Sequence, residues 1–239
     1  MPLPTIATPT YELEIPSTKQ NVKYRPFLVK EEKILILAME SEDNRQIANA
    51  VKEVISNCIK TKGIKIEELS TFDIEYLFLN IRGKSVGETV DVLITCPDDG
   101  TTQVPKSIAL DEIKVRIDPE HSKDIKLDES LSLRMRYPSL NEFIKANFGS
   151  DSTITVEDTF DLICSCIEQV YSEEESWSAK DCTKKELKEF VESLTSNQFK
   201  DVEKFFDTMP KLSHTIKVKN PNTEVESEVV LEGLSAFFA

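Results

Sequence analysis

The sequence predicts a mixed α+β protein, with helical, bundle-like lobes combined with a small antiparallel β module and terminal hairpins. Three observations predict this class. Apolar residues recur at helical spacing at Ile47, Val51, Val54 and Ile55, and similar spacing returns later in the chain. Within residues 86–137 the apolar period becomes two, as in a half-buried strand. Alternating runs around turn residues also stand near both ends of the chain.

Residues 1–85 are predicted to form a hairpin followed by helices. Two alternating runs, at 11–15 and 22–26, flank the turn-like PSTKQ and predict the hairpin. The apolar run at 34–39 is too short to assign by periodicity, but its Lys/Glu-rich start favours a buried helix. Gly63 ends the next helix, and an S-x-x-D start signal then precedes the helical pattern of FDIEYLFLNIRG.

Residues 86–137 are predicted to be a small β module. CPDDG supplies a turn, and QVPKSIAL returns as the second strand of a hairpin. Two more alternating runs follow, at 113–117 and 131–137. The apolar face of the first strand is made of Val90, Val92, Ile94 and Cys96.

The remainder is predicted to be helical over residues 138–212, with a hairpin and an apolar tail at 213–239. The acidic stretch YSEEESW interrupts the helical pattern, and Thr183 and Glu186 form a capping box for the helix that follows it. The last hairpin turns at NPNT and is followed by GLSAFFA. We expect this C-terminal segment to form one compact unit with the β module.

The two hairpins share one pattern of residues. Each has an alternating strand, a turn of the form x-Pro-Asp/Asn and a second alternating strand, so that Cys96-Pro97-Asp98 aligns with Asn220-Pro221-Asn222. Two hairpins with the same turn could lie side by side. Independent turn chemistry explains the similarity equally well, because Pro, Asp and Asn all favour turns.

Composition excludes several classes of protein. The 239 residues are 39% hydrophobic and 30% charged, which is enough to bury a core. The net charge of −14 argues against nonspecific binding to nucleic acid or to an anionic membrane, and suits either solubility or docking to a basic protein surface. The chain has no run of about 18 apolar residues and no secretory signal pattern, so we expect a soluble protein of the cytoplasm or of an assembly built there.

The first hairpin turn raises the question of a metal site, because a cysteine next to Pro97 is half of a zinc knuckle. A structural zinc needs four thiolate or imidazole ligands, commonly as two C-x2-C pairs. The partner position of Cys96 holds Asp99, and the second turn offers only Asn220 and Thr223. We therefore expect no metal and no cofactor, with a zinc-ribbon-like binding module that uses Cys96 as the alternative.

No catalytic motif stands out. Cys164 and Cys166 would point roughly 200° apart on a helix, so they cannot chelate or pair there. Five cysteines without a signal peptide indicate free thiols, and Cys182 lies in a polar stretch. His121 and His214 belong to no motif with defined chemistry. The sequence predicts that the protein is not an enzyme.

Two segments are candidates for partner binding. YRPFLVKEEK places Tyr24, Arg25 and Phe27 in an extended stretch before a helix, and this aromatic and arginine content is typical of interface anchors. The alternative is that these three residues only pack in the core. Phe237 and Phe238 stand at a chain end that would normally fray, so they either pack on the domain or dock on a partner.

Three stretches carry a resemblance to a known family: YRPFLVKEEKILILAME, FDIEYLFLNIRGKSVGE and VVLEGLSAFF. In this order they resemble the baseplate hub family of T-even-type contractile-tailed bacteriophages. The resemblance implies a non-enzymatic virion protein of the tail baseplate, assembled in the host cytoplasm, either a hub subunit or a hub assembly factor. It implies a hetero-oligomeric assembly with other baseplate hub proteins. Some members look like zinc ribbons with cysteine-rich turns, but this chain keeps only Cys96.

Overall fold

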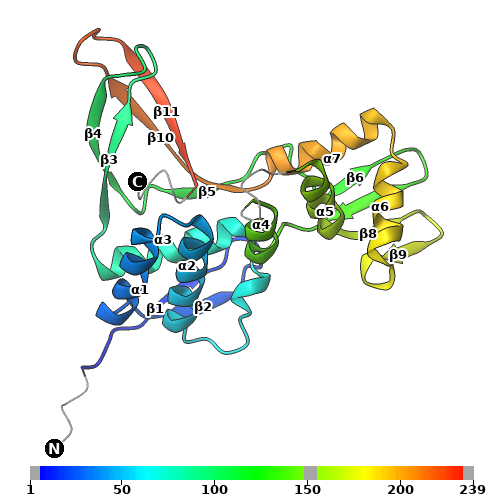
Figure 1. Cartoon of the computed structure of the whole chain (residues 1–239), viewed down its shortest axis with the longest axis horizontal. Helices are drawn as coiled ribbons and strands as arrows, with labels where there is room; N and C mark the ends of the chain where they lie inside the picture. The colour runs from blue at the N-terminus through cyan, green and yellow to red at the C-terminus, as the bar shows by residue number, and fades with distance from the viewer. Residues whose placement is uncertain (1–5, 148–154, 234–239) are drawn as a thin grey trace, which may run out of the picture. The chain divides into compact units, whose positions relative to one another are not determined.

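The computed structural model describes residues 6–147 and 155–233, and its fold confirms the predicted mixed α+β class. The chain divides into two compact units (Figure 1). None of the helices in the two described ranges has the length and apolar character needed to cross a membrane. Unit 1 comprises residues 1–66, 72–116 and 211–239, and unit 2 comprises residues 67–71 and 117–210.

Unit 1 joins the first part of the chain to its last hairpin. Its helices are α1 (Val29–Glu40), α2 (Asn44–Cys58) and α3 (Thr71–Ser85), and a 3-10 turn at Ile66–Glu68 precedes α3. Its strands are β1 (Tyr11–Glu14), β2 (Asn21–Tyr24), β3 (Thr89–Thr95), β4 (Gln103–Ala109), β5 (Lys114–Arg116), β10 (Lys211–Lys219) and β11 (Glu226–Glu232). β1 pairs with β2, β3 pairs with β4, and β10 lies between β11 and β5, always antiparallel.

The β3–β4 and β10–β11 hairpins share one apolar core. Because side chains alternate along a strand, every second residue of β3 faces this core. The buried residues of the cluster are Leu79, Val90, Val92, Ile94, Cys96, Ile108, Leu110, Ile113, Leu212 and Val218. The cluster brings together strands that are more than 100 residues apart in the sequence, and α3 contributes Leu79 to it.

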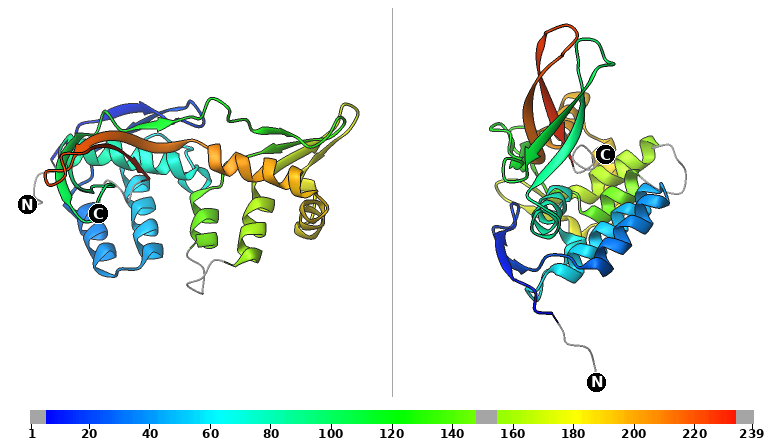
Figure 2. Two further views of the ribbon diagram at one scale, coloured as in Figure 1. Left: turned by 90° about the horizontal axis from the view of Figure 1, so that it is seen from above. Right: turned by 90° about the vertical axis from the view of Figure 1, so that its left-hand side faces the viewer.

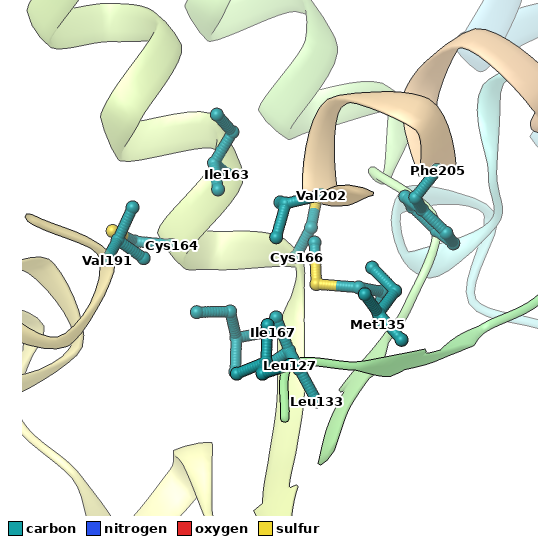
Figure 3. Packing of buried hydrophobic residues seen from close by; sticks show 11 residues of the cluster. Leu127, Leu133, Met135, Ile163, Cys164, Cys166, Ile167, Val191, Val202 and Phe205 are labelled. Atoms are coloured by element: carbon teal, nitrogen blue, oxygen red, sulfur yellow. The ribbon is translucent and has the colours of Figure 1, made fainter. Parts of the chain in front are cut away.

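Unit 2 is a four-stranded antiparallel sheet with helices. The strands lie in the order β6 (Asp124–Lys126), β7 (Ser132–Met135), β8 (Ile167–Tyr171) and β9 (Ser176–Ser178). The helices are α4 (Leu140–Asn147), α5 (Val156–Cys166), α6 (Lys184–Glu192) and α7 (Ser196–Thr208), with a 3-10 turn at Ala179–Asp181. Capping boxes at Thr155, Thr183 and Thr195 begin α5, α6 and α7. Apolar residues of β7, α5 and α7 meet in its core (Figure 3).

The boundaries of the two units differ from those of the four predicted segments. The predicted β module at 86–137 is divided, because β3, β4 and β5 belong to unit 1 whereas β6 and β7 belong to unit 2. The predicted helical segment at 138–212 contributes β8 and β9, and β8 pairs with β7. A period of two identifies a strand but does not specify its partner, so the pairing could not be assigned locally.

The run at 34–39 forms a helix, as predicted, but not a buried one. Only Glu31 and Ala38 are buried on α1, and Ile36, Leu37 and Met39 are 51%, 56% and 58% exposed. At 100° per residue, six consecutive apolar residues cover more than one full turn, so they cannot all face one side. α1 lies beside α2, and that neighbour covers one side of it (Figure 2). The prediction of a buried helix is therefore wrong.

A buried ion pair links the end of β2 to the start of α1. Glu31 is 0% exposed and Arg25 is 8% exposed, and Arg25 Nη2 lies 2.9 Å from Glu31 Oε1. The other carboxylate oxygen accepts the Leu28 N–H at 2.9 Å. Burial raises the pKa of the Glu31 carboxyl, but the hydrogen bonds from Arg25 and Leu28 outweigh it and leave the pKa below its usual value.

Removal of one partner of this pair should destabilise the protein strongly. Arg25→Met leaves the buried Glu31 carboxylate with only the Leu28 N–H and the exposed Lys30 ammonium, 3.3 Å from Oε1, as partners. We expect it to lower the free energy of unfolding by about 3 kcal/mol. The double substitution Arg25→Met with Glu31→Leu removes both charges and should cost clearly less than the single one. Urea unfolding at neutral pH measures both values.

The matched control is the exposed pair between Lys23 and Glu12 on the neighbouring hairpin. Lys23→Met should change the free energy of unfolding by less than about 1 kcal/mol, because exposed ion pairs contribute little. If Arg25→Met lowers the free energy of unfolding no more than Lys23→Met does, the buried pair of Arg25 and Glu31 does not stabilise unit 1.

Candidate functional site

The turns of the β3–β4 and β10–β11 hairpins of unit 1 begin in the same way. In the first turn the Gly100 N–H donates to the Cys96 carbonyl at 2.9 Å, and in the second the Glu224 N–H donates to the Asn220 carbonyl at 2.9 Å. Gly100 and Glu224 both have left-handed conformations, with φ of 66° and 61°. The turns therefore correspond over their first five residues, with Cys96 equivalent to Asn220 as the shared sequence pattern indicates. The first turn is one residue longer, because the Cys96 N–H donates to the Thr102 carbonyl whereas the Asn220 N–H donates to the Val225 carbonyl.

The two turns meet at Asn220, a side chain with only 1% exposure. Its amide nitrogen donates to both carboxylate oxygens of Asp98, at 3.1 and 2.9 Å, and to Asp99 Oδ2 at 3.0 Å. The Thr223 hydroxyl donates to Asp98, and the Asn222 amide nitrogen donates to the Thr102 hydroxyl at 2.9 Å. This network, which we call the tip cluster, fastens β10–β11 to β3–β4 (Figure 1).

The polar surroundings of the tip cluster set its ionisation. A hydrogen bond from Thr223, followed by one from Asn220, lowers the pKa of the Asp98 carboxyl. Hydrogen bonds from the side chain and the backbone of Thr102 hold the pKa of Asp99 well below its usual value. Both side chains are therefore carboxylates at neutral pH. Burial raises the pKa of the Cys96 thiol, and the two neighbouring carboxylates raise it further.

The four positions of a zinc ribbon hold a different set of residues in this chain. Two C-x2-C pairs would occupy Cys96, Asp99, Asn220 and Thr223, and only the first of these is a thiol. Over residues 6–147 and 155–233, no group of three or more His, Cys, Asp or Glu side chains is arranged to hold a metal ion. The amide of Asn220 instead joins the two turns by hydrogen bonds to carboxylates.

The remaining cysteines lie mostly within the two cores. Cys164 and Cys166 are both buried in unit 2, and burial raises the pKa of Cys166 to about 12 (Figure 3). Burial likewise raises the pKa of Cys58, to about 11. Of the five cysteines, Cys182 is the one that is not buried. A thiol with a raised pKa forms little thiolate at neutral pH and is a poor nucleophile.

The two histidines have structural contacts. His121 lies in an aromatic cluster with Tyr137 and Phe205, and its ring nitrogens are 3.0 Å from the Thr208 hydroxyl and 3.1 Å from the Tyr137 hydroxyl. Burial, together with the Lys123 charge, lowers its pKa. His214 Nε2 lies 3.8 Å from a carboxylate oxygen of Glu112. Among the described residues, no hydrogen bond joins a histidine to a cysteine.

The structure places the predicted partner-binding residues of YRPF inside unit 1. Tyr24 is 2% exposed, Arg25 is held in the ion pair with Glu31, and Phe27 is half-buried with its N–H donated to the Ser85 hydroxyl at 2.9 Å. Tyr24 and Arg25 thus have a structural role in the isolated chain and little surface to offer. The candidates Phe237 and Phe238 lie outside the described residues, and partner binding by this set stays a prediction.

Sequence reasoning missed the surface of α1. Val29 is 79% exposed, and it lies on the same side of the helix as the half-exposed Ile36. Leu37 and Met39 flank this side, so that four large apolar residues of one 12-residue helix are exposed to solvent. The sequence contained a signal for this exposure. The charged residues Glu32, Lys33 and Glu40 lie on the same side of the helix as Val29 and Ile36.

Comparisons with known proteins agree with the resemblance seen in the sequence. The family model described as T4 bacteriophage base plate protein matches residues 8–239. The chain is also similar to the baseplate hub assembly protein gp26 of Enterobacteria phage T4. The two are 23% identical over 231 residues, which cover 95% of this chain and 97% of that protein. No solved structure gives a significant match.

A charge at position 220 should separate the two hairpins in a pH-dependent way. Asn220→Asp exchanges the donor amide for a third carboxyl beside Asp98 and Asp99, so we expect a loss of at least about 2 kcal/mol in the free energy of unfolding at pH 7. The new carboxyl has a pKa raised above its unfolded value, so its folded state keeps a proton that the unfolded state releases.

The destabilisation of Asn220→Asp relative to the natural chain should therefore grow as the pH rises from about 4 and be smallest under acid conditions. Chemical unfolding at several pH values measures it. Gln103→Glu is the matched control, because it exchanges an exposed amide at the start of β4, outside the tip cluster, for a carboxylate. Equal and pH-independent effects of the two substitutions would contradict the assignment of Asn220 as the junction.

Three substitutions should convert the tip cluster into a zinc site. Asp99→Cys, Asn220→Cys and Thr223→Cys together with Cys96 complete two C-x2-C pairs on turns that already meet. We expect one zinc per chain by elemental analysis and a gain in stability that a chelator reverses. The same triple variant with Cys96→Ser is the control and should bind zinc more weakly. If the triple variant folds but binds no zinc, the four side chains do not lie at the positions of zinc ligands.

Proposed function

Because the chain belongs to the T4 bacteriophage base plate protein family, we propose that it is a structural or assembly component of the hub of a contractile-tail baseplate. It acts through contacts with other baseplate hub proteins and performs no catalysis. It reaches the tail baseplate of the virion after assembly in the host cytoplasm. The similarity of the chain to a baseplate hub assembly protein over nearly its whole length supports this proposal.

The exposed apolar side of α1 is the observation that carries a role in protein–protein contacts. Val29, Ile36, Leu37 and Met39 are between 51% and 79% exposed, on a helix that contacts its neighbour α2 on the other side. Apolar area removed from water contributes about 25 cal/mol per Å². A protein partner that covers this side of α1 would gain that free energy.

The absence of catalysis in the proposal has its own support. Burial raises the pKa values of the four thiols in the cores and at the tip cluster, which disfavours them as nucleophiles. The pair of carboxylates at the tip cluster is saturated by hydrogen bonds from Asn220, Thr223 and Thr102. Carboxylates held in this way stay ionised and serve to position the turns.

Replacement of the exposed residues of α1 should block assembly without unfolding the chain. For the double substitution Ile36→Gln with Met39→Gln, we expect a change of less than about 0.5 kcal/mol in the free energy of unfolding, because both residues are exposed. Recovery of baseplate proteins with the tagged chain from infected cells should fall at least about tenfold, as expected when interface anchors are lost.

The matched control is Leu93→Gln, which removes a 65% exposed apolar residue from β3. Leu93→Gln should leave recovery unchanged. A folded α1 variant that recovers baseplate proteins normally would rule out α1 as the interface and leave the hub role open. Failure of the natural tagged chain to recover any baseplate protein would count against the hub role itself.

A further inference from the structure

Unit 2 contains an apolar groove that the tip cluster and α1 do not involve. Its volume is about 320 Å³, which suits one or two side chains better than a large cofactor. Its walls are formed by residues of β8, β9 and α6, by the residue before β7 and by Cys182 before α6. The apolar residues that line it are Leu131, Val170, Trp177, Cys182, Leu187 and Phe190.

Local structure fixes the walls of the groove. Val170 and Trp177 face each other in the register of β8 and β9. The capping box of Thr183 and Glu186 sets the start of α6 and so the place of Leu187 one residue later. Trp177 keeps 45% of its surface exposed. A large aromatic side chain that is partly exposed in a groove is typical of a binding surface. It supplies contact area at a small cost in side-chain entropy.

The charge around the groove selects the chemistry of its occupant. Unit 2 has 23 Asp and Glu against 11 Lys and Arg, so it holds −12 of the net charge of −14. The turn that joins β8 to β9 holds Glu173, Glu174 and Glu175, all exposed. In the described part of the chain none of these three forms an ion pair. Glu186 adds a carboxylate at the groove itself.

We propose that this groove binds an apolar side chain, aromatic or branched aliphatic, in a polypeptide segment with flanking Lys or Arg residues. Such a segment would place its anchor against Trp177 and Phe190 and its cations near Glu173, Glu174 and Glu175. The inference rests on the proposed function in taking a protein as the partner. A second copy of the chain, a nucleic acid or an anionic lipid would meet like charge.

The chain has two built-in reporters for occupation of this groove. Trp177 is its single tryptophan, and Cys182 is the one cysteine of five that is not buried. Binding of an apolar anchor should shift the emission of Trp177 to shorter wavelength and shield it from acrylamide. It should also slow alkylation of Cys182. Both signals come from residues that line the groove, so they separate binding there from binding elsewhere.

The experiment titrates the purified full chain with a synthetic peptide that carries Leu-Phe between pairs of lysines. One control peptide has Ser-Ser in place of Leu-Phe, and another has glutamates in place of the lysines. We expect both controls to bind at least about tenfold more weakly and the binding of the first peptide to weaken as salt is added. Prior alkylation of Cys182 with a bulky maleimide should abolish binding.

Two exposed acidic triplets in unit 2 provide matched variants. Glu173→Gln, Glu174→Gln and Glu175→Gln together should weaken binding of the lysine peptide several-fold. Asp201→Asn, Glu203→Gln and Asp207→Asn on α7 remove the same charge and should have a smaller effect. Equal effects of the two triplets would overturn the assignment of the cations to the β8–β9 turn.

No change in Trp177 or Cys182 with the lysine peptide would overturn the proposal, as would equal binding of the control peptides. A Trp177 shift that follows self-association, measured by sedimentation, would assign the groove to a second copy and also overturn it. The assay contains no baseplate protein. Its failure would therefore leave the hub role standing, and loss of recovery from infected cells would leave the peptide result standing.

Discussion

The arrangement of the β structure in unit 1 depends on one amide group. Asn220 donates to two carboxylates of the neighbouring turn, and its own burial is nearly complete. A buried amide without partners would cost free energy, so the two hairpins stay together at the point where their apolar faces end. The apolar core that the hairpins share begins next to this junction, with Cys96 and Val218. Charge-assisted hydrogen bonds thus do at the tips what a metal does in a zinc ribbon.

The second internal anchor of unit 1, the pair of Arg25 and Glu31, explains why an aromatic and arginine segment is not a surface feature. The Glu31 carboxylate satisfies the first turn of α1 and the Arg25 guanidinium at the same time. This contact fixes where α1 begins and how it leaves β2. With the buried side of α1 set in this way, the excess apolar residues of the helix face solvent, where they are free to contact another protein.

The two units differ in the surface that they offer. Unit 1 carries little net charge and an exposed apolar helix side, whereas unit 2 carries most of the negative charge and an apolar groove beside an acidic turn. A partner of the first surface would gain binding free energy from apolar area alone, whereas a partner of the second would also be selected by its charge. One chain with two such surfaces is suited to holding two different neighbours in an assembly.

Most of the secondary structure follows from the sequence by itself. The helical spacing around Ile47, the capping box at Thr183, and the matching turns at Cys96 and Asn220 depend on residues within a few positions of each other, and the structure has each of these elements. The sequence also determined the acidic charge and the shared turn pattern of the tip cluster. Composition and local patterns alone, however, did not reveal the family.

Only the tertiary structure decided which strands pair, which side of α1 is covered and where Arg25 lies. β7 pairs with β8 across about 30 residues, and β10 packs with β3 across more than 100, so their partners depend on loop closure and competing pairings rather than on local preference. The side of α1 that is covered follows from the placement of α2 and from the Glu31 contact. Burial is a property of the neighbours that a residue acquires on folding, and a linear pattern of apolar residues limits those neighbours without choosing among them.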